Sequence, residues 1–336
     1  MNRAAEPLKY VNSNKQNIMI MKVGIVLPEA GPQATKENII QAAKQAEEEG
    51  FDSLWVWERH LYPIKPQTPY PNTPDGSFPI EFQTVLDALE TLTFVAANTN
   101  KIALGTSVID MLFHNPVILA RRFATLDVFS EGRAIAGFGI GWLKDEYQAF
   151  NVPLNDRGKR ADEYIRLIKK IWIDDIVEFK GKYYSIPASK IGPKPLQKPH
   201  PPIYMGAFSP GAFRRTVKYT NGWIGMIYGT LDNFENTINT IRNMANQEKE
   251  ANNNESGFKV ILLTYPKVVE EREQNPSKKV DQRPPMTGTI DEIGSDLQRI
   301  KDMGVEHVIF GYSFGPIGRD VDKIVDITKQ LAKFAR

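Results

Sequence analysis

Three ionisable side chains lie directly after the apolar run at residues 53–57 (SLWVW), where a long loop begins. They are Glu58, Arg59 and His60. Histidine changes its charge near neutral pH and therefore suits proton transfer, in which a neighbouring carboxylate can take part. His60 is the first candidate for acid–base catalysis and Glu58 the second. A solvated ion pair at the start of a loop is the alternative interpretation.

Small and polar residues end two other apolar runs. Residues 102–108 (IALGTSV) end in Ser107 and Val108, where small polar side chains could bind a cofactor ring or simply end a strand. Residues 133–138 lead into Gly139, Gly141 and Trp142. Glycines at alternate positions let a backbone approach a ligand closely, or let a strand bend. Neither pattern is specific by itself, so both alternatives stay open.

A fourth pattern joins a short apolar run to a helix. Gly206, Ala207 and Ser209 precede Pro210, which begins the helix expected over residues 210–219. The free N–H groups of a helix N-terminus, together with a serine hydroxyl, could bind a phosphate group. Ser209 is also a good N-cap residue and Pro210 a good first helical residue. The two interpretations are compatible.

Composition excludes several classes of function. The chain of 336 residues has 42 Lys and Arg, 40 Asp and Glu and no Cys, for a formal charge of +2. It lacks the positive excess of a protein that binds nucleic acid through bulk charge. Without cysteine, it has no disulfide, thiolate zinc site, iron–sulfur cluster or cysteine nucleophile. We expect no metal site, because the carboxylates Asp145 and Glu146 come without a histidine cluster.

The N-terminal segment and the hydropathy suggest a cytoplasmic protein. Residues 1–20 are polar and aperiodic, without the apolar core of a signal peptide, so we expect a disordered leader. The translation start could be Met1, Met19 or Met21. No apolar run reaches the length of about 18 residues that a membrane span needs.

Eight short apolar runs alternate with helical patterns between residues 22 and 335. Such alternation predicts a parallel sheet, and eight units predict a single (β/α)8 TIM barrel with insertions. A doubly wound sheet is the alternative, but no Gly-x-Gly-x-x-Gly follows the first run. The expected strands are 23–27, 53–57, 102–108, 133–138, 203–206, 222–226, 258–263 and 306–310, and the helices after the second and third strands are 81–97 and 116–130.

A set of short motifs, in order along most of the chain, resembles the bacterial luciferase-like monooxygenase superfamily. The long loop with Tyr62-Pro63 and residues 69–71 (PYP) is most similar to its coenzyme F-420-dependent subgroup. F-420 is an 8-hydroxy-5-deazaflavin. The motifs are 46–56 (AEEEGFDSLWV) leading to His60, 102–108 (IALGTSV), 114–127 (HNPVILARRFATLD), 130–133 (SEGR), 137–142 (GFGIGW), 157–163 (RGKRADE), 193–195 (PKP), 201–203 (PPI) and 221–223 (NGW).

The resemblance implies roles for most of the candidate residues. His60 matches a histidine that faces the cofactor ring and handles a proton. Ser107 and Val108 match a bulge that often holds a non-prolyl cis peptide bond against the ring. Gly139 and Gly141, with Trp142 beside them, match the backbone next to the ring. The segment with Gly206, Ala207 and Ser209 matches the region that contacts the cofactor's phosphate or ribityl chain.

Two positions depart from the sugar-phosphate dehydrogenases of the superfamily. Arg59 stands where those enzymes have an aspartate before the histidine. Trp142 stands where they have a glutamate acid after the glycines. Both departures argue against sugar-phosphate oxidation and leave the proton donor open, with Glu58 as a substitute.

Residues 21–336 are therefore expected to form one luciferase-like barrel that binds F-420 and transfers a hydride between its C5 atom and a small organic substrate. The first alternative is a monooxygenase that uses reduced FMN and oxygen, with a separate reductase supplying the reduced cofactor. The second is a non-catalytic flavin-binding protein on the same fold. The resemblance also implies a homodimer that pairs through helices near the second and third strands. No nucleic-acid or membrane partner is expected.

Overall fold

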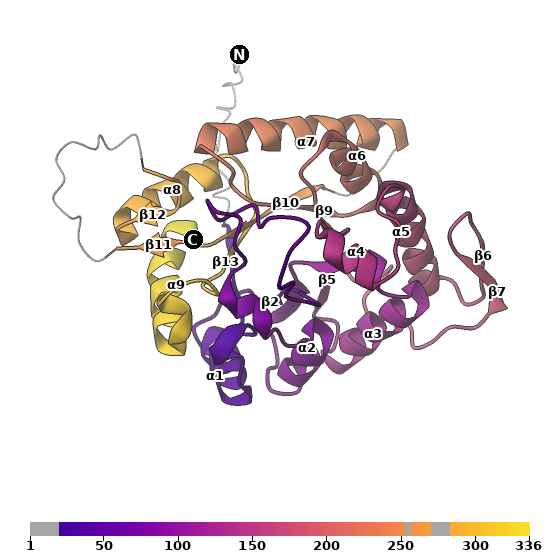
Figure 1. Cartoon of the computed structure of the whole chain (residues 1–336), viewed down its shortest axis with the longest axis horizontal. Helices are drawn as coiled ribbons and strands as arrows, with labels where there is room; N and C mark the ends of the chain where they lie inside the picture. Colours follow the sequence, from indigo (N-terminus) through magenta and orange to yellow (C-terminus); the bar gives the residue numbers. More distant parts are fainter. Residues whose placement is uncertain (1–19, 253–256, 270–282) are drawn as a thin grey trace, which may run out of the picture.

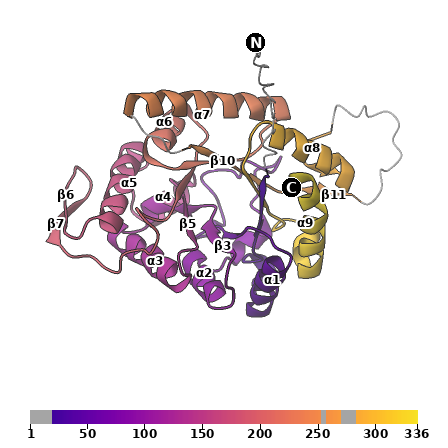
Figure 2. The same cartoon turned by 180° about the vertical axis from the view of Figure 1, so that it is seen from behind.

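The computed structural model describes residues 20–252, 257–269 and 283–336. The expected leader therefore lies outside the described residues, apart from Ile20. Figure 1 shows helices arranged as a ring around a central set of strands, and Figure 2 shows the same ring from behind.

The strands form a closed parallel barrel, as predicted. The main sheet has nine strands in the order β3-β2-β1-β13-β10-β9-β8-β5-β4, and it closes because β3 also pairs with β5. The two-residue strand β4 continues the path of β3, which leaves the eight strands of the predicted barrel. The strands are β1 (Lys22–Val26), β2 (Ser53–Val56), β3 (Ala103–Thr106), β4 (Ile109–Asp110), β5 (Ala134–Gly139), β8 (Ile203–Gly206), β9 (Gly222–Gly225), β10 (Lys259–Thr264) and β13 (His307–Phe310).

Amphipathic helices cover the outside of the barrel. Their apolar faces pack on the strands. The strands are therefore buried on both sides, as in β2. The capping box that Thr289 and Glu292 predict at the start of α8 is present. The covering helices are α1 (Lys36–Glu48), α2 (Ala88–Ala96), α3 (Pro116–Phe129), α5 (Arg157–Ile173), α6 (Pro210–Tyr219), α7 (Leu231–Asn252), α8 (Ile290–Asp302) and α9 (Val321–Ala335).

A tryptophan fills the inside of the barrel. A Cβ atom at Gly24 or Gly105 would lie 2.7 Å or 2.4 Å from the ring of Trp55, so these two glycines make room for the indole. Next to it, Nε2 of His307 lies 2.7 Å from Oγ of Ser53. Burial lowers the pKa of His307 to about 3, so this histidine is a neutral core residue.

Two predicted elements differ from the structure. The expected helix 81–97 is split into a short 3-10 helix, η2 (Ile80–Gln83), and α2, because Thr84 is extended and the Asp87 side chain caps the N–H groups of Leu89 and Glu90. The expected strand 102–108 stops at Thr106, where a cis peptide bond joins Ser107 to Val108 before β4.

Three further features surround the barrel. The short helix α4 (Lys144–Ala149), which was not predicted, lies inside the helix ring in Figure 1. A hairpin of β6 (Val177–Lys180) and β7 (Ser185–Ser189) extends outward from the ring of helices. A small parallel pair, β11 (Lys267–Val268) and β12 (Thr287–Gly288), flanks β10 and α8 in sequence. Among the described helices, none has the length and apolarity needed to cross a bilayer.

Candidate active site

A cavity of about 880 Å³ lies at the carboxyl ends of the strands, where TIM barrels carry their active sites. Its walls come from the segments after β2, β3, β5, β8, β9, β10 and β13. Aromatic rings dominate these walls, and they include those of Trp57, Tyr70, Phe82, Trp142, Tyr265 and Phe314. A cavity of this size and lining suits a planar organic ring system.

A second chamber of about 710 Å³ adjoins the first. The two chambers share Tyr70, Tyr228, Tyr265 and Phe314 as wall residues, so they form one cleft with two compartments. Lys267 is the single charged side chain among the described residues that line the second chamber.

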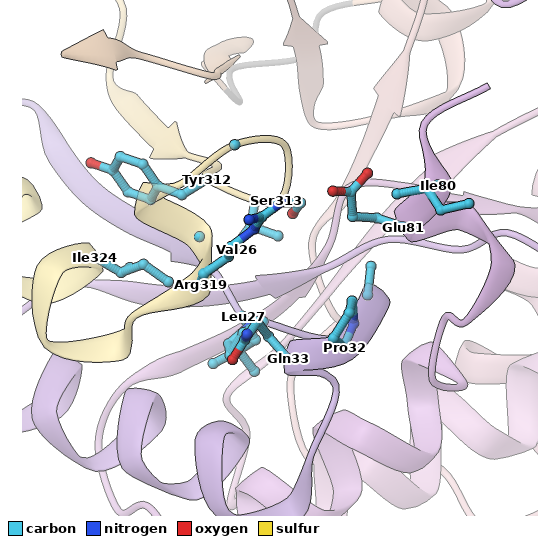
Figure 3. Close-up of a pocket in the computed structure, with 14 residues that line it drawn as sticks. Val26, Leu27, Pro32, Gln33, Ile80, Glu81, Tyr312, Ser313, Arg319 and Ile324 are labelled. Atoms are coloured by element: carbon cyan, nitrogen blue, oxygen red, sulfur yellow. The ribbon is translucent and has the colours of Figure 1, made fainter. Parts of the chain in front are cut away.

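A third, smaller cavity of about 380 Å³ lies beside the second chamber and shares Tyr312 and Gly315 with it. Figure 3 shows Pro32, Gln33, Ile80 and Glu81 on one side of it and Tyr312 and Arg319 on the other. None of the residues selected from the sequence lines this cavity.

Three polar atoms in the wall of the first chamber lack a hydrogen-bond partner within the described part of the chain. They are Oγ of Ser107, Nε1 of Trp57 and Nε of Arg59. Buried polar groups are almost always hydrogen-bonded in folded proteins, so such atoms indicate a place where a ligand supplies the partner. The Ser107–Val108 peptide bond, whose two residues also line this chamber, is cis as the resemblance implied.

The glycines after β5 shape this wall without bordering the chamber themselves. A Cβ atom at Gly139 would lie 2.6 Å from Oδ1 of Asp110 and 2.6 Å from Cγ2 of Val108. Gly141 has a φ of +77°, a conformation that favours glycine. Glycine at position 139 therefore leaves room for Val108 and Asp110 in the chamber wall, and Trp142 borders the chamber directly.

After β8, the candidates Gly206, Ala207 and Ser209 do not line the chamber, although Phe208 and Phe213 of the same segment do. Ala207 is buried, and its carbonyl accepts a hydrogen bond from the indole of Trp223. Oγ of Ser209 caps α6 by accepting a hydrogen bond from the N–H of Ala212 at 3.4 Å. The N-cap interpretation of Ser209 is confirmed, and the phosphate interpretation stays a prediction.

Glu58 sits between two histidines at the edge of the first chamber. Its Oε1 lies 2.9 Å from Nε2 of His114, and its Oε2 lies 3.1 Å from Nε2 of His60. Burial by itself would raise the pKa of Glu58, but the contacts with His114 and His60 lower it to about 2. Glu58 is therefore ionised at neutral pH.

His60 lies behind Glu58 and is not among the residues that border either chamber. Its ring packs 4.6 Å from that of Phe150 and 5.8 Å from that of Phe113. Burial favours the neutral imidazole, but the contact with Glu58 and the charge of Glu58 outweigh it and raise the pKa of His60. The resemblance implied that the His60 ring faces the cofactor. In the described structure, however, this ring does not border the chamber.

Arg59 takes the chamber position next to Glu58. Its guanidinium is 5.3 Å from the ring of Trp142 and 5.4 Å from that of Phe82, within reach of cation–π attraction. Its Nη1 also lies 2.6 Å from Oε2 of the fully buried Glu146. Arg59 is thus paired within the chain and holds α4 against the segment after β2.

Glu58, His60 and His114 place three potential metal-ligand atoms within 4.8 Å of one another, a grouping that the sequence analysis missed. Because each oxygen of Glu58 already faces one imidazole, we interpret the group as an ion cluster. The sequence places His114 56 residues after Glu58, and no local spacing signals their contact.

Asp110 is a buried acid in the wall of the first chamber that sequence reasoning did not select as a site. It ends β4 and is only 7% exposed, yet it borders the first chamber. Its position three residues after Ser107 was the available signal, but nothing in the sequence showed that this acid would be buried.

Comparisons with known proteins agree with the fold. The family model described as luciferase-like monooxygenase matches residues 21–287. An uncharacterized protein of Mycobacterium tuberculosis is 34% identical over 185 residues, which cover 54% of this chain and 65% of that protein. The F420-dependent glucose-6-phosphate dehydrogenase of Kineococcus radiotolerans is 34% identical over 200 residues, which cover 58% of this chain and 54% of that enzyme. Each match spans less than two thirds of the relative.

Solved structures match over almost the whole chain. An F420-dependent secondary alcohol dehydrogenase, solved with an F420-acetone adduct, has a TM-score of 0.72 at 19% identity and covers 95% of this chain and 100% of its own. A monooxygenase from Streptomyces bottropensis also has a TM-score of 0.72, at 20% identity, and covers 93% of this chain and 98% of its own. At these identities the likeness shows the fold alone.

Proposed function

This chain belongs to the luciferase-like monooxygenase family, and on that premise we propose that it is an F-420-dependent oxidoreductase that transfers a hydride between the cofactor and a small organic substrate. Membership of this family makes the protein an oxidoreductase or monooxygenase. The choice of cofactor is supported by relatives that are named F420-dependent dehydrogenases.

The observation that carries the proposal is the aromatic chamber with its unpartnered polar atoms. A bound deazaflavin supplies or accepts a hydride at its C5 atom. In our proposal, Ser107, Val108 and Trp142 hold its ring, and Trp57 and Arg59 provide hydrogen-bond donors. The N-terminus of α6 at Ser209 takes its phosphate, next to Gly206 and Ala207.

The second chamber is the proposed substrate site. Aromatic, proline and methionine side chains line most of it, with Lys267 as the one cation among its described lining residues. Arg59, the nearest strong cation in the first chamber, is already paired with Glu146. A sugar phosphate would leave its charge poorly compensated here, so we propose an uncharged organic substrate.

The Pro-rich segment between β2 and η2 closes one side of the cleft. Tyr70 and Phe78 of this segment pack on the ring of Trp142, at centroid distances of 6.0 Å and 5.9 Å. In the proposed reaction these rings keep water away from the reacting atoms, which strengthens the electrostatic interactions there.

A binding titration tests the cofactor. The purified protein is titrated with F-420 and, separately, with FMN, each in its oxidised and reduced form. We expect binding of F-420 at low-micromolar affinity or better, and weaker binding of FMN. Such a result leads to a substrate screen under anaerobic conditions with uncharged alcohols and carbonyl compounds, and binding of neither cofactor contradicts the proposal.

The second candidate is an FMN-dependent monooxygenase. The fold match to the Streptomyces bottropensis monooxygenase and the family's own name favour it. This activity needs a separate reductase that supplies reduced FMN. Preference for reduced FMN in the same titration, followed by oxygen consumption, would select it over the first candidate.

A further inference from the structure

The carboxyl group of Asp110 is buried against the chamber with no partner of its own. Its backbone N–H donates to Oε2 of Glu58 at 3.1 Å, which fixes the end of β4. Oδ1 lies so close to Gly139 that a Cβ atom there would be 2.6 Å away. Within the described part of the chain, no group donates a hydrogen bond to either carboxyl oxygen of Asp110. Its remaining open side is the first chamber.

The charges around Asp110 are unbalanced. From the segment after β2 it faces Glu58, Arg59 and His60, and from α4 it faces Glu146. Arg59 is the one permanent cation among these groups, and Glu146 already pairs with it at 2.6 Å. Burial, together with the charges of Glu146 and Glu58, outweighs Arg59 and raises the pKa of Asp110 to about 7.

The neighbouring hydroxyl of Tyr147 does not supply the missing partner. It donates to the backbone carbonyl of Ile140, and burial raises the pKa of Tyr147 far above neutrality. Tyr147 therefore stays protonated and engaged. Asp110 is therefore an acid that borders the chamber and exists in both protonation states near neutral pH.

We infer that Asp110, rather than His60, exchanges the proton that accompanies the hydride in the first chamber. The inference rests on the proposed function, which requires such a proton. Asp110 borders the chamber and its carboxyl is free, whereas the His60 imidazole is turned onto Phe113 and Phe150 behind Glu58.

The proposed proton transfer accounts for all atoms and electrons in the oxidation of an alcohol. The C–H bond breaks with its electron pair, and the hydride leaves for the oxidised cofactor. The O–H bond breaks at the same time, its electrons form the second bond of the carbonyl group, and the Asp110 carboxylate takes the proton. In the reverse direction, neutral Asp110 gives its proton to the carbonyl oxygen while the carbon accepts the hydride.

An infrared titration of the protein without cofactor tests the acid itself. Carboxyl and carboxylate bands are followed from about pH 5 to about pH 9, where most carboxylates no longer titrate. The wild type should show a carboxyl that titrates near pH 7 and that Asp110→Asn lacks, which distinguishes it from Glu29, another buried acid whose pKa burial raises. Asp302→Asn, which removes an exposed acid at the end of α8, should keep it. Retention of the band in Asp110→Asn overturns the inference.

A calorimetric titration tests the link between the proton and the redox state. Oxidised and reduced F-420 are bound in two buffers of different ionisation enthalpy, which reports protons taken up on binding. We expect the two forms to differ in proton uptake near pH 7 in the wild type and in His60→Gln, and this difference to disappear in Asp110→Asn. A difference lost in His60→Gln and kept in Asp110→Asn assigns the proton to His60 and overturns the inference.

The outcomes separate this inference from the proposed function. If the wild type does not bind F-420 at all, the proposed function fails, whatever the infrared titration shows. If F-420 binds and no carboxyl titrates near neutrality, the function stands and the role of Asp110 is wrong. With any substrate from the anaerobic screen, Asp110→Asn should lower kcat/KM by a factor of about 10² to 10⁴, the usual contribution of general acid–base catalysis.

Discussion

Single residues in the ion cluster set how the protein responds to acid. Glu58 has a pKa of about 2 in the folded protein against an ordinary value of 4.5, because His114 and His60 stabilise its charge against the opposing effect of burial. A carboxylate with a lowered pKa stabilises the fold above its unfolded pKa. That contribution is lost as the pH falls through the folded value.

We therefore predict that Glu58→Gln flattens the acid side of the stability curve. The wild type should lose about 3 kcal/mol of its free energy of unfolding between about pH 4.5 and about pH 2 through this group. Glu58→Gln should lack that loss, and it should be less stable than the wild type at pH 7. Urea unfolding at a series of pH values measures both effects, and parallel curves for the two proteins would contradict the prediction.

Ionisation of Asp110 changes the stability of the fold in the opposite direction to ionisation of Glu58. Its raised pKa means that the folded protein holds this proton more tightly than the unfolded chain, so ionisation destabilises the fold as the pH rises from about 3.8 to about 7. Asp110→Asn removes that cost, which the shift of about three pKa units sets at up to about 4 kcal/mol. The variant should melt higher than the wild type at pH 8 and equally at pH 4. Equal melting temperatures at pH 8 would show that Asp110 ionises without cost.

At the scale of elements, the end of β5 determines the shape of the chamber. A methyl group at Gly139 would meet Asp110 and Val108 at 2.6 Å, whereas a methyl group at Gly257, just before β10, meets nothing within 4 Å. We predict that Gly139→Ala folds but binds F-420 at least tenfold more weakly, because the chamber wall must shift. Gly257→Ala is the matched control and should bind normally, because Gly257 lies before β10 and lines neither chamber. Fluorescence titration measures both, and normal binding by Gly139→Ala would separate this wall from the cofactor site.

The start of α6 offers a second test at this scale. Ser209→Ala removes the N-cap bond to Ala212, which at 3.4 Å is long, so the loss of stability should be about 0.5 kcal/mol. If the proposed phosphate site is correct, the variant should also bind F-420 more weakly while it binds phosphate-free 8-hydroxy-5-deazariboflavin as the wild type does. Equal losses for both ligands would assign Ser209 a capping role alone.

For the whole molecule, the exposed face of α3 supports the proposed homodimer. Ile118 is 51% exposed and Phe129 is 62% exposed, and at 11 residues apart they lie on the same face of the helix. We predict a dimer in sedimentation experiments that Phe129→Glu weakens, because a buried, unpaired carboxylate opposes association. Ile173→Glu places the same charge at a similarly exposed isoleucine, 52% exposed, at the end of α5 and should leave the dimer intact. A monomeric wild type would contradict the prediction.

The barrel was predictable because each of its elements is encoded locally. Runs such as VGIV in β1 are buried on both faces, the helices carry one apolar face each, and caps such as Thr35 and Thr289 mark where helices begin. Prediction was less accurate where a local signal pointed two ways. The pattern over 81–97 reads as one helix, and only the cap made by Asp87 shows where α2 begins.

The sequence by itself determined the family and the fold, because these depend on short motifs and on burial periodicity, and it predicted a site at the carboxyl ends of the strands. Only the tertiary structure decided which side chains face the chamber. Glu58 meets His114 from 56 residues away, and Arg59 meets Glu146 from 87 residues away. These contacts turn His60 away and leave Asp110 buried without a partner. Burial and charge act through space between separate elements, so no local spacing could have revealed them.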